Sequence, residues 1–285
     1  MRSAILPLAI VATALGALVG GCRAHGIEQV GEVALLESVK PQLPREFRIA
    51  SWNIQKGLRA GMPADLERLV RTSDPQILLL QEAHEQLELT PLATNLFATS
   101  WRYPWFAQSR VGVHTAAIVR AMNPRSLETR FRELGFTSPK VSLITEYRLP
   151  DDQRLMTVNV HCMNFERFGT TRFRAQLGRL REEMAGHSGP IVMAGDFNTW
   201  RAERLGLLQA MTKDLDLVEV DQFPSGRTTA TKRSRWVDWL LGIDPELALD
   251  RVYYRGLDVV EADVLDYDSS DHRPIVVGFS LPSDS

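Results

Sequence analysis

The stretch Ile191–Trp200 reads IVMAGDFNTW, and the interpretation of the whole chain depends on it. Its apolar run ends at a glycine, which is typical of a buried strand. Asp196 and Asn198 follow directly and lie two positions apart, so an extended chain places both side chains on one face. A solvated turn can have the same composition. The other segments of the chain decide between these two interpretations.

The composition indicates a globular protein with one large domain or two small ones. The chain has 285 residues, of which 44% are hydrophobic and 24% are charged. A formal net charge of −2 gives no overall attraction to nucleic acid or anionic lipid. A polyanion would therefore need a local basic patch or a metal ion. The only cysteines are Cys22 and Cys162, which excludes a disulfide framework.

The first residues indicate export from the cytoplasm. Arg2 precedes an uncharged apolar segment that ends in small residues before Cys22, which is the pattern of a signal peptide. The position of this cysteine resembles the lipobox of bacterial lipoproteins, in which the cysteine is lipidated and becomes the new N-terminus. An uncleaved membrane anchor is the alternative, although the apolar run is short for a spanning helix.

We therefore expect three regions along the chain. They are a lipoprotein-type signal peptide at 1–21, a tether at 22–45 and a folded domain at 46–282. Either kind of anchor would hold the protein on a membrane, facing the periplasm or the cell exterior.

Hydrophobic periodicity predicts alternating strands and helices in the domain. Strands are expected at 47–52, 77–80, 113–120, 141–149, 155–161, 191–194, 249–254, 259–264 and 275–279. Helices are expected at 63–73, 85–97, 170–185 and 201–211.

Polar side chains recur where the predicted strands end. They are Asn53, Glu82, His161 with Asn164, Asp196 with Asn198, and Asp271 with His272. A sandwich of sheets would gather such ends at one edge. Carboxylate and amide oxygens suit a hard ion such as Mg²⁺, and a histidine beside an aspartate suits proton and phosphate handling. Taken singly, each residue could equally be a solvated cap or a structural histidine.

Five motifs in this order, SWNI, LLLQE, NVHCMNF, MAGDFNTW and SDHRP, resemble the endonuclease/exonuclease/phosphatase (deoxyribonuclease I-like) superfamily. HSGPIVMAGDFNTW, VNVHCMNF and the YYRGL that follows LD are most similar to its YafD-like bacterial branch. The resemblance covers about residues 46–280. It implies an α/β fold, a four-layer sandwich with two packed, mostly antiparallel sheets flanked by helices. It also implies a metal-dependent phosphodiesterase or related hydrolase.

The resemblance implies a role for each matched residue. The ligands of Mg²⁺, or of Mn²⁺ in its place, would be Glu82, Asn53 and Asp271. Asp196 would position or deprotonate the attacking water, and Asn198 would orient the water and the phosphate. His272 would stabilise the charge of the phosphoryl group, and His161 would contact the phosphate or the leaving group.

Two aspartates compete to orient the ring of His272. Asp238 in WVDWL and Asp250 in LDRVY both resemble the family motif. In the family, this aspartate begins a strand that is followed by one further strand before SDH. Asp250 fits this order because only the strand at 259–264 intervenes, whereas Asp238 would leave an extra segment. We therefore assign the role to Asp250.

The substrate stays open at this point. Residues 223–242 combine basic and tryptophan side chains, so Arg233 and Arg235, together with Asn164, are candidate substrate-binding residues. Solvated arginines beside packed tryptophans are the alternative. Gln55 and His161 stand where abasic endonucleases carry an acidic residue and a tyrosine, which argues against a DNA-repair enzyme.

Three functions fit these observations. The first is an exported Mg²⁺-dependent phosphodiester hydrolase that acts on nucleic acid, as an endonuclease. The second is a membrane-tethered hydrolase of phospholipid headgroups, of sphingomyelinase or phosphoinositide type. The third is a non-catalytic binding module that has kept the fold. No protein partner is evident from the sequence.

Overall fold

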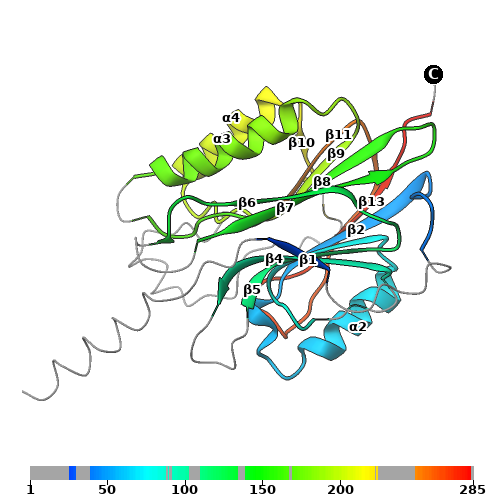
Figure 1. Cartoon of the computed structure of the whole chain (residues 1–285), viewed down its shortest axis with the longest axis horizontal. Helices are drawn as coiled ribbons and strands as arrows, with labels where there is room; N and C mark the ends of the chain where they lie inside the picture. Colours follow the sequence, from blue (N-terminus) through cyan, green and yellow to red (C-terminus); the bar gives the residue numbers. More distant parts are fainter. Residues whose placement is uncertain are drawn as a thin grey trace, which may run out of the picture.

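Two β-sheets pack face to face, and helices cover their outer faces (Figure 1). The structure is a computed structural model that describes residues 26–29, 39–87, 89, 92–102, 110–133, 139–166, 169–221, 223 and 248–283. It is the four-layer α/β sandwich that the sequence predicts. Within these ranges, no helix is both long and apolar enough to cross a membrane.

The first sheet has seven strands in the order β1-β4-β5-β3-β2-β13-β12. They are β1 (Ile27–Gln29), β2 (Glu46–Asn53), β3 (Ile77–His84), β4 (Thr94–Arg102), β5 (Arg110–Ala117), β12 (Asp258–Val264) and β13 (Ile275–Ser280). Neighbouring strands are antiparallel except β2 and β3, which are parallel because α2 (Met62–Ser73) connects them. Helix α2 buries Leu66 and Leu69 against the outer face of this sheet.

The second sheet has six strands in the order β10-β11-β9-β8-β7-β6. They are β6 (Met122–Glu128), β7 (Val141–Arg148), β8 (Arg154–His161), β9 (Ile191–Asp196), β10 (Val218–Glu219) and β11 (Asp250–Arg255). Strands β8 and β9 are parallel, and α3 (Thr171–Ala185) connects them. Helices α3 and α4 (Ala202–Asp214) pack on the outer face through residues such as Phe173, Leu180 and Leu208.

A polar bridge crosses the interface between the two sheets. The Gln81 amide donates to Asn159 Oδ1 at 2.8 Å. The Asn159 amide in turn donates to the backbone carbonyls of Leu80 and His114, at 3.2 and 3.0 Å. Because these groups are buried, each bond avoids an unsatisfied polar atom. These hydrogen bonds fix the position of the second sheet along the strands of the first.

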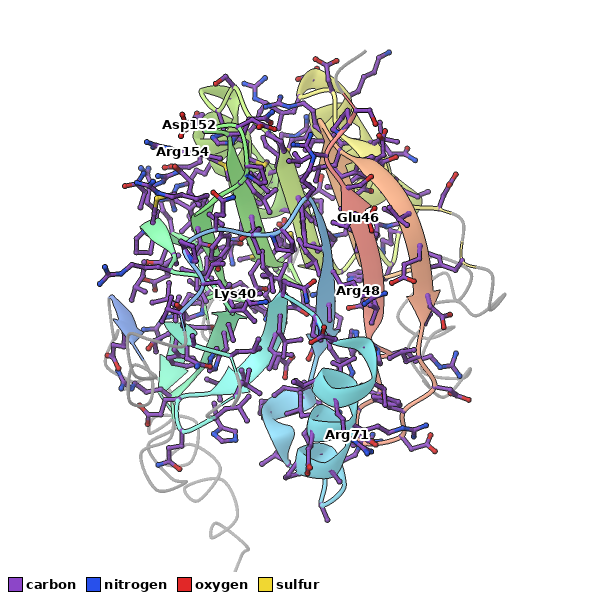
Figure 2. The ribbon with its side chains drawn as sticks, turned by 90° about the vertical axis from the view of Figure 1, so that its right-hand side faces the viewer. Lys40, Glu46, Arg48, Arg71, Asp152 and Arg154 are labelled. Atoms are coloured by element: carbon purple, nitrogen blue, oxygen red, sulfur yellow. The ribbon has the colours of Figure 1, made fainter. Side chains whose placement is uncertain are left out.

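The two ends of the sandwich carry different groups. At the end that we call the Asp196 pole, β2, β3, β8 and β9 end and β7 and β11 begin. At the opposite end, which we call the Glu46 pole, β2, β3, β8 and β9 begin and β7 and β11 end. Figure 2 shows Lys40, Glu46, Asp152 and Arg154 at the Glu46 pole.

The predicted helix at 85–97 is wrong. Residues from Thr94 onwards form β4, and Glu85 lies in a turn. The two faces of β4 are both covered, since Phe97 packs in the outer cluster and Leu96 and Ala98 pack in the inner one. A strand buried on both faces has no apolar–polar alternation that would distinguish it from a helix.

Three further strands have no counterpart in the sequence prediction. Strand β6 is an edge strand with largely polar residues, β10 has two residues, and β1 lies inside the expected tether. The expected signal peptide and the residues Cys22, Arg233, Arg235 and Asp238 lie outside the described residues.

Candidate active site

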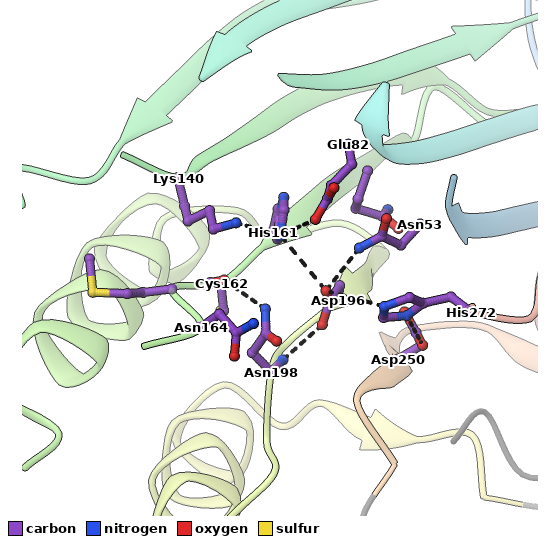
Figure 3. Close-up of polar contacts among 12 residues, drawn as sticks. Asn53, Glu82, Lys140, His161, Cys162, Asn164, Asp196, Asn198, Asp250 and His272 are labelled. Carbon is purple, nitrogen blue, oxygen red and sulfur yellow. Dashed lines mark hydrogen bonds and ion pairs between the residues drawn. The ribbon is translucent and has the colours of Figure 1, made fainter. Parts of the chain in front are cut away.

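The strand ends bring their polar side chains together at the Asp196 pole (Figure 3). Asn53, His161 and Asp196 are the last residues of β2, β8 and β9, and Asp250 is the first residue of β11. Asp250 lies opposite Asp196 in the antiparallel register, and His161 lies beside Asp196 in the parallel one. The arrangement of the strands therefore places these groups next to one another.

Unusual backbone conformations shape the site. Gly195 has a φ of 143°, and a Cβ atom there would lie 2.0 Å from the carbonyl oxygen of Val160, so only glycine fits before Asp196. Glu82 and Asn198 both adopt a φ of 50°, which is uncommon for residues other than glycine. Glu82 also lies at a register shift of β3, which takes it out of the regular ladder. Local strain of this kind is often concentrated at functional sites.

The carboxylate of Asp196 is the centre of the cluster. Its Oδ1 accepts a hydrogen bond from the backbone N–H of Asn198 at 3.0 Å, and its Oδ2 accepts one from the Asn53 amide at 3.0 Å. The same Oδ2 lies 3.7 Å from Nε2 of His161 and 4.0 Å from Nε2 of His272. One oxygen of a buried carboxylate thus faces two imidazole rings.

His272 is paired with a carboxylate on its other nitrogen. Its Nδ1 lies 2.7 Å from Oδ2 of Asp250, and both residues are buried. Burial by itself lowers the pKa of His272, but the Asp250 carboxylate raises it to about 10. Burial raises the pKa of Asp250 to about 6, which still leaves this acid deprotonated at pH 7. The pair is therefore an imidazolium held by a carboxylate.

His161 is in the opposite state. Burial and the neighbouring Lys140 lower the pKa of His161 to about 4, so its ring is neutral at pH 7. Nζ of Lys140 lies 3.1 Å from Nε2 of His161. Because an ammonium group can only donate, Nε2 is the acceptor and the ring proton resides on Nδ1. Lys140 is a component of the site that the sequence analysis missed.

Glu82 presents a charged carboxylate to the same space. Burial would raise the pKa of Glu82, but His161, Lys140 and Lys56 lower it to about 2. Nζ of Lys56 lies 3.4 Å from Oε2 of Glu82, and Nε2 of His161 lies 3.9 Å from its Oε1. The acid is therefore available as an anionic oxygen donor.

Two of the remaining expected residues border the cluster. The backbone carbonyl of Asn164 accepts hydrogen bonds from Trp200 Nε1 at 3.1 Å and from the guanidinium of Arg204. These two bonds hold the loop that follows β8 in place. Arg204 is almost fully buried, and the sequence analysis did not identify it either. The Asn198 amide donates to the Cys162 carbonyl at 2.9 Å, which holds Asn198 in place.

Comparison with known proteins identifies the family of the chain. The model of the Endonuclease/Exonuclease/phosphatase family matches residues 50–272. The chain belongs to this family. A UPF0294 protein of Yersinia pseudotuberculosis is 36% identical over 235 residues, which is 82% of this chain and 83% of the relative. A UPF0294 protein of Photorhabdus laumondii is also 36% identical, over 82% of this chain and 84% of the relative.

Solved structures of family members share the fold. An endonuclease/exonuclease/phosphatase from Beutenbergia cavernae superposes with a TM-score of 0.62 and 17% identity, covering 83% of this chain and 72% of that protein. The human Nocturnin catalytic domain with bound sulfate gives 0.57 and 18%, covering 85% and 96%. Members of the family are hydrolases of phosphodiesters or phosphate esters, and they generally use divalent metal ions.

The donors at the Asp196 pole fit a hard divalent ion. Glu82 offers a charged carboxylate, Asn53 an amide oxygen, and Asp271 a buried Oδ1 that lacks a hydrogen-bond partner among the described residues. The described part of the chain contains no group of three His, Cys, Asp or Glu side chains arranged to hold a metal ion. A magnesium ion commonly keeps several water ligands and needs only one or two carboxylates. When bound, such an ion would neutralise phosphate charge and acidify a water molecule.

Proposed function

We propose that the chain is a Mg²⁺-dependent phosphodiester hydrolase that is exported from the cytoplasm and anchored to a membrane through its N-terminal segment. The observation that carries this proposal is the pair of unlike imidazoles around Asp196. His272 is charged through Asp250, and His161 is neutral beside Lys140. An anionic ester needs a fixed positive charge at the phosphoryl oxygens and a separate group to accept the proton of water; His272 offers the first and Asp196 the second.

The chain's own residues suggest a direct order of events. Asp196, oriented by Asn198 and Asn53, accepts a proton from the attacking water as the new P–O bond forms. The charged ring of His272 stabilises the negative charge on the phosphoryl oxygens. The ester P–O bond breaks as the new bond forms, and Lys140 and His161 contact the phosphate or the leaving oxygen. Because the ring of His161 is neutral, the ammonium group of Lys140 supplies the proton that the leaving oxygen takes up.

Nucleic acid is the first substrate class that we propose, cleaved internally. Its support is two cationic side chains at the Asp196 pole, because Lys56 lies 3.4 Å from Glu82 and Lys140 lies 3.1 Å from His161. Arg233 and Arg235, the other candidates for substrate binding, lie outside the described residues. Phospholipid headgroups are the second class. One observation favours them: β1, which follows the expected membrane anchor, is the edge strand of the first sheet, so the chain between anchor and domain is short.

A substrate screen tests the reaction and its substrate together. Purified full-length protein with Mg²⁺ would be offered plasmid DNA, RNA and vesicles of labelled phospholipids. We expect cleavage that disappears in Asp196→Asn and persists in Asp214→Asn, a matched change at an exposed ion pair on α4. Cleavage of lipids alone would reject the nuclease proposal. No cleavage of any of the three would reject the phosphodiesterase proposal.

The anchor is tested separately by fractionation. If Cys22 is lipidated, Cys22→Ser should release the protein from membranes or block its maturation. Unchanged retention of the variant would instead assign the anchoring to the apolar segment at residues 4–20. Wild-type protein found only in the soluble fraction would reject membrane attachment.

A further inference from the structure

Strand β1 fixes where the N-terminal part of the chain meets the domain. It pairs antiparallel with β4, with Ile27 opposite Ala98 and Gln29 opposite Leu96. Strand β4 runs from the Glu46 pole to the Asp196 pole, since Ala98 lies opposite Val113 and Val113 lies opposite Gln81. Ile27 is therefore level with Gln81, the neighbour of Glu82. The chain enters the domain on the side of the active site.

A salt bridge holds this short strand in place. The guanidinium of Arg110, the first residue of β5, bonds both carboxylate oxygens of Glu28 and also the carboxylate of Glu85. A three-residue edge strand is weak by itself, so this bidentate contact contributes much of its attachment. We call β1 together with the Glu28–Arg110 pair the β1 clamp.

The length of chain before β1 limits the distance between anchor and active site. Cys22 precedes Ile27 by five positions, which span at most about 17 Å when fully extended. If residues 4–20 are the anchor instead, the seven positions from Gly20 span at most about 25 Å. Both kinds of anchor therefore keep the Asp196 pole close to the bilayer.

Exposed apolar side chains flank the active site at the same pole. Leu58 follows the 3₁₀ turn Gln55–Gly57, which comes just after Asn53, and its exposed fraction is 80%. Phe131, which follows the end of β6, has an exposed fraction of 44%, and the Arg172 guanidinium lies 5.3 Å from its ring centroid. An exposed apolar residue such as Leu58, and an apolar ring beside a guanidinium group as at Phe131, both suit the headgroup level of an anionic bilayer.

We propose that the Asp196 pole is the membrane-docking face of the protein and that its partner is an anionic phospholipid bilayer. The inference rests on the anchoring included in the proposed function. Leu58 and Phe131 enter the interface on either side of the catalytic groups, and the β1 clamp sets the orientation. The active site then faces the membrane surface, so the substrates that reach it most readily are phosphodiesters located at that surface.

The β1 clamp can be removed without touching the catalytic groups. After β1, the next described contact of the chain with the sheets is Lys40, whose N–H donates to the Ile118 carbonyl at 3.1 Å at the Glu46 pole. Lys40 is eighteen positions after Cys22, so a released tether would reach about 60 Å and leave from the opposite end. Releasing β1 should therefore abolish the orientation while the anchor remains.

Energy transfer from single-cysteine probes measures the orientation. Full-length anchored protein would carry a donor dye at Ala60→Cys, at the Asp196 pole, or at Gln153→Cys, in the turn at the Glu46 pole. Cys162 is buried and a lipidated Cys22 has no free thiol, so neither would be labelled; if residues 4–20 are the anchor, both proteins would also carry Cys22→Ser. The vesicles would contain phosphatidylglycerol and an acceptor on the lipid headgroups. We expect transfer from position 60 to exceed transfer from position 153 by at least about twofold, because an eight-residue strand separates the poles by about 26 Å.

Single substitutions test separately whether the β1 clamp and Leu58 contribute to the orientation. Glu28→Lys should equalise the two transfer efficiencies, whereas Glu261→Lys, the same change at an exposed ion pair with Arg48, should preserve their difference. Leu58→Ser should lower transfer from position 60, whereas Val260→Ser, at an equally apolar exposed site far from the pole, should not.

Equal transfer in the wild type, or greater transfer from position 153, would overturn the inference. Because no readout uses hydrolysis, an inactive but oriented protein would reject the proposed reaction and leave the docking face intact.

Discussion

One hydrogen bond, from His272 Nδ1 to Asp250 at 2.7 Å, sets the charge of a reacting side chain. Asp250→Asn keeps the shape of the partner but removes the carboxylate that favours the charged ring. In hydrolases, loss of an orienting carboxylate can cost up to ~10⁴ in rate. We expect turnover to fall by about two to four orders of magnitude, with little change in the melting temperature. Steady-state kinetics and a thermal melt would check this.

Asp238→Asn is the control for that prediction. Asp238 was the competing candidate; because Asp250 already holds Nδ1 of His272, the amide variant of Asp238 should leave turnover nearly unchanged. A loss at Asp238 with a silent Asp250 would mean that the contact between Asp250 and His272 does not operate in catalysis. The assignment of strands before SDH would then need to be revised.

Lys140 provides a second prediction for a single side chain. Its ammonium group donates to Nε2 of His161, so Lys140→Met should free that nitrogen and remove a cation from the site. We expect kcat to fall by about 10²-fold, which is the lower range for a positioned catalytic group. Lys140→Arg should restore part of the activity, because the charge and a donor remain. Lys213→Met, at an exposed residue in the last turn of α4, is the control and should retain full activity.

The site residues differ in how far the sequence could predict them. Asn53, His161 and Asp196 end apolar strands, so periodicity alone locates them. Lys140 precedes its strand and carries no such signal. The β7–β8 hairpin pairs Leu143 with Asn159, and continuing this register by two residues brings Val141 opposite His161, so the pairing of the two predicted strands could have pointed to Lys140. Arg204 could not be predicted, because an arginine on a helix is normally solvated. It is buried because its guanidinium donates to the carbonyls of Met163 and Asn164.

Among the elements, tertiary packing decides where the sequence pattern is ambiguous. The first four residues of β4 were predicted as the end of a helix, because the sandwich covers both faces of this strand. Strand β1 has three residues and depends on Arg110, which is more than eighty positions away in the sequence. Local propensity contains no information about such a partner. In contrast, α2, α3 and α4 each bury one face and were found close to their predicted bounds.

Strand β5 supports a prediction about acid stability. His114 is fully buried in β5, and its Nε2 donates to Asn95 Oδ1 at 3.0 Å when the proton resides on that nitrogen. Burial lowers the pKa of His114 to about 3, whereas the unfolded chain has the ordinary value of about 6.5. Between these values the unfolded state binds a proton that the folded state does not, so stability falls as the pH falls. The loss is up to about 1.4 kcal/mol per pH unit.

Urea unfolding at pH 7 and pH 5 measures this contribution. His114→Gln keeps a donor for Asn95 but cannot be protonated, so the decrease in unfolding free energy between the two pH values should be smaller by about 1–2 kcal/mol. His187→Gln, at a histidine in the turn after α3, is the matched control and should preserve the wild-type decrease. An unchanged pH dependence in His114→Gln would show that the buried ring is not the titrating group.

At the scale of the whole molecule, the two sheets meet so that donors from both contribute to one oxygen-rich site. Glu82 and Asn53 come from the first sheet, and Asp196 comes from the second. A divalent ion bound there binds the folded state alone, so it should stabilise the sandwich by mass action. The gain is about 2.7 kcal/mol at a hundred times the dissociation constant, which corresponds to several degrees in melting temperature.

Chelation of the ion is therefore expected to affect both activity and stability. EDTA should abolish hydrolysis and lower the melting temperature, and Mg²⁺ or Mn²⁺ should restore both. Glu82→Gln removes the charge that attracts the ion, so it should raise the Mg²⁺ concentration required for activity and reduce the thermal shift. Glu146→Gln, at a buried glutamate paired with Arg125 on β6, should keep the wild-type Mg²⁺ response. Full activity after exhaustive chelation would reject the metal assignment, because the charge of the phosphodiester would then be neutralised by His272, Lys140 and Lys56 alone.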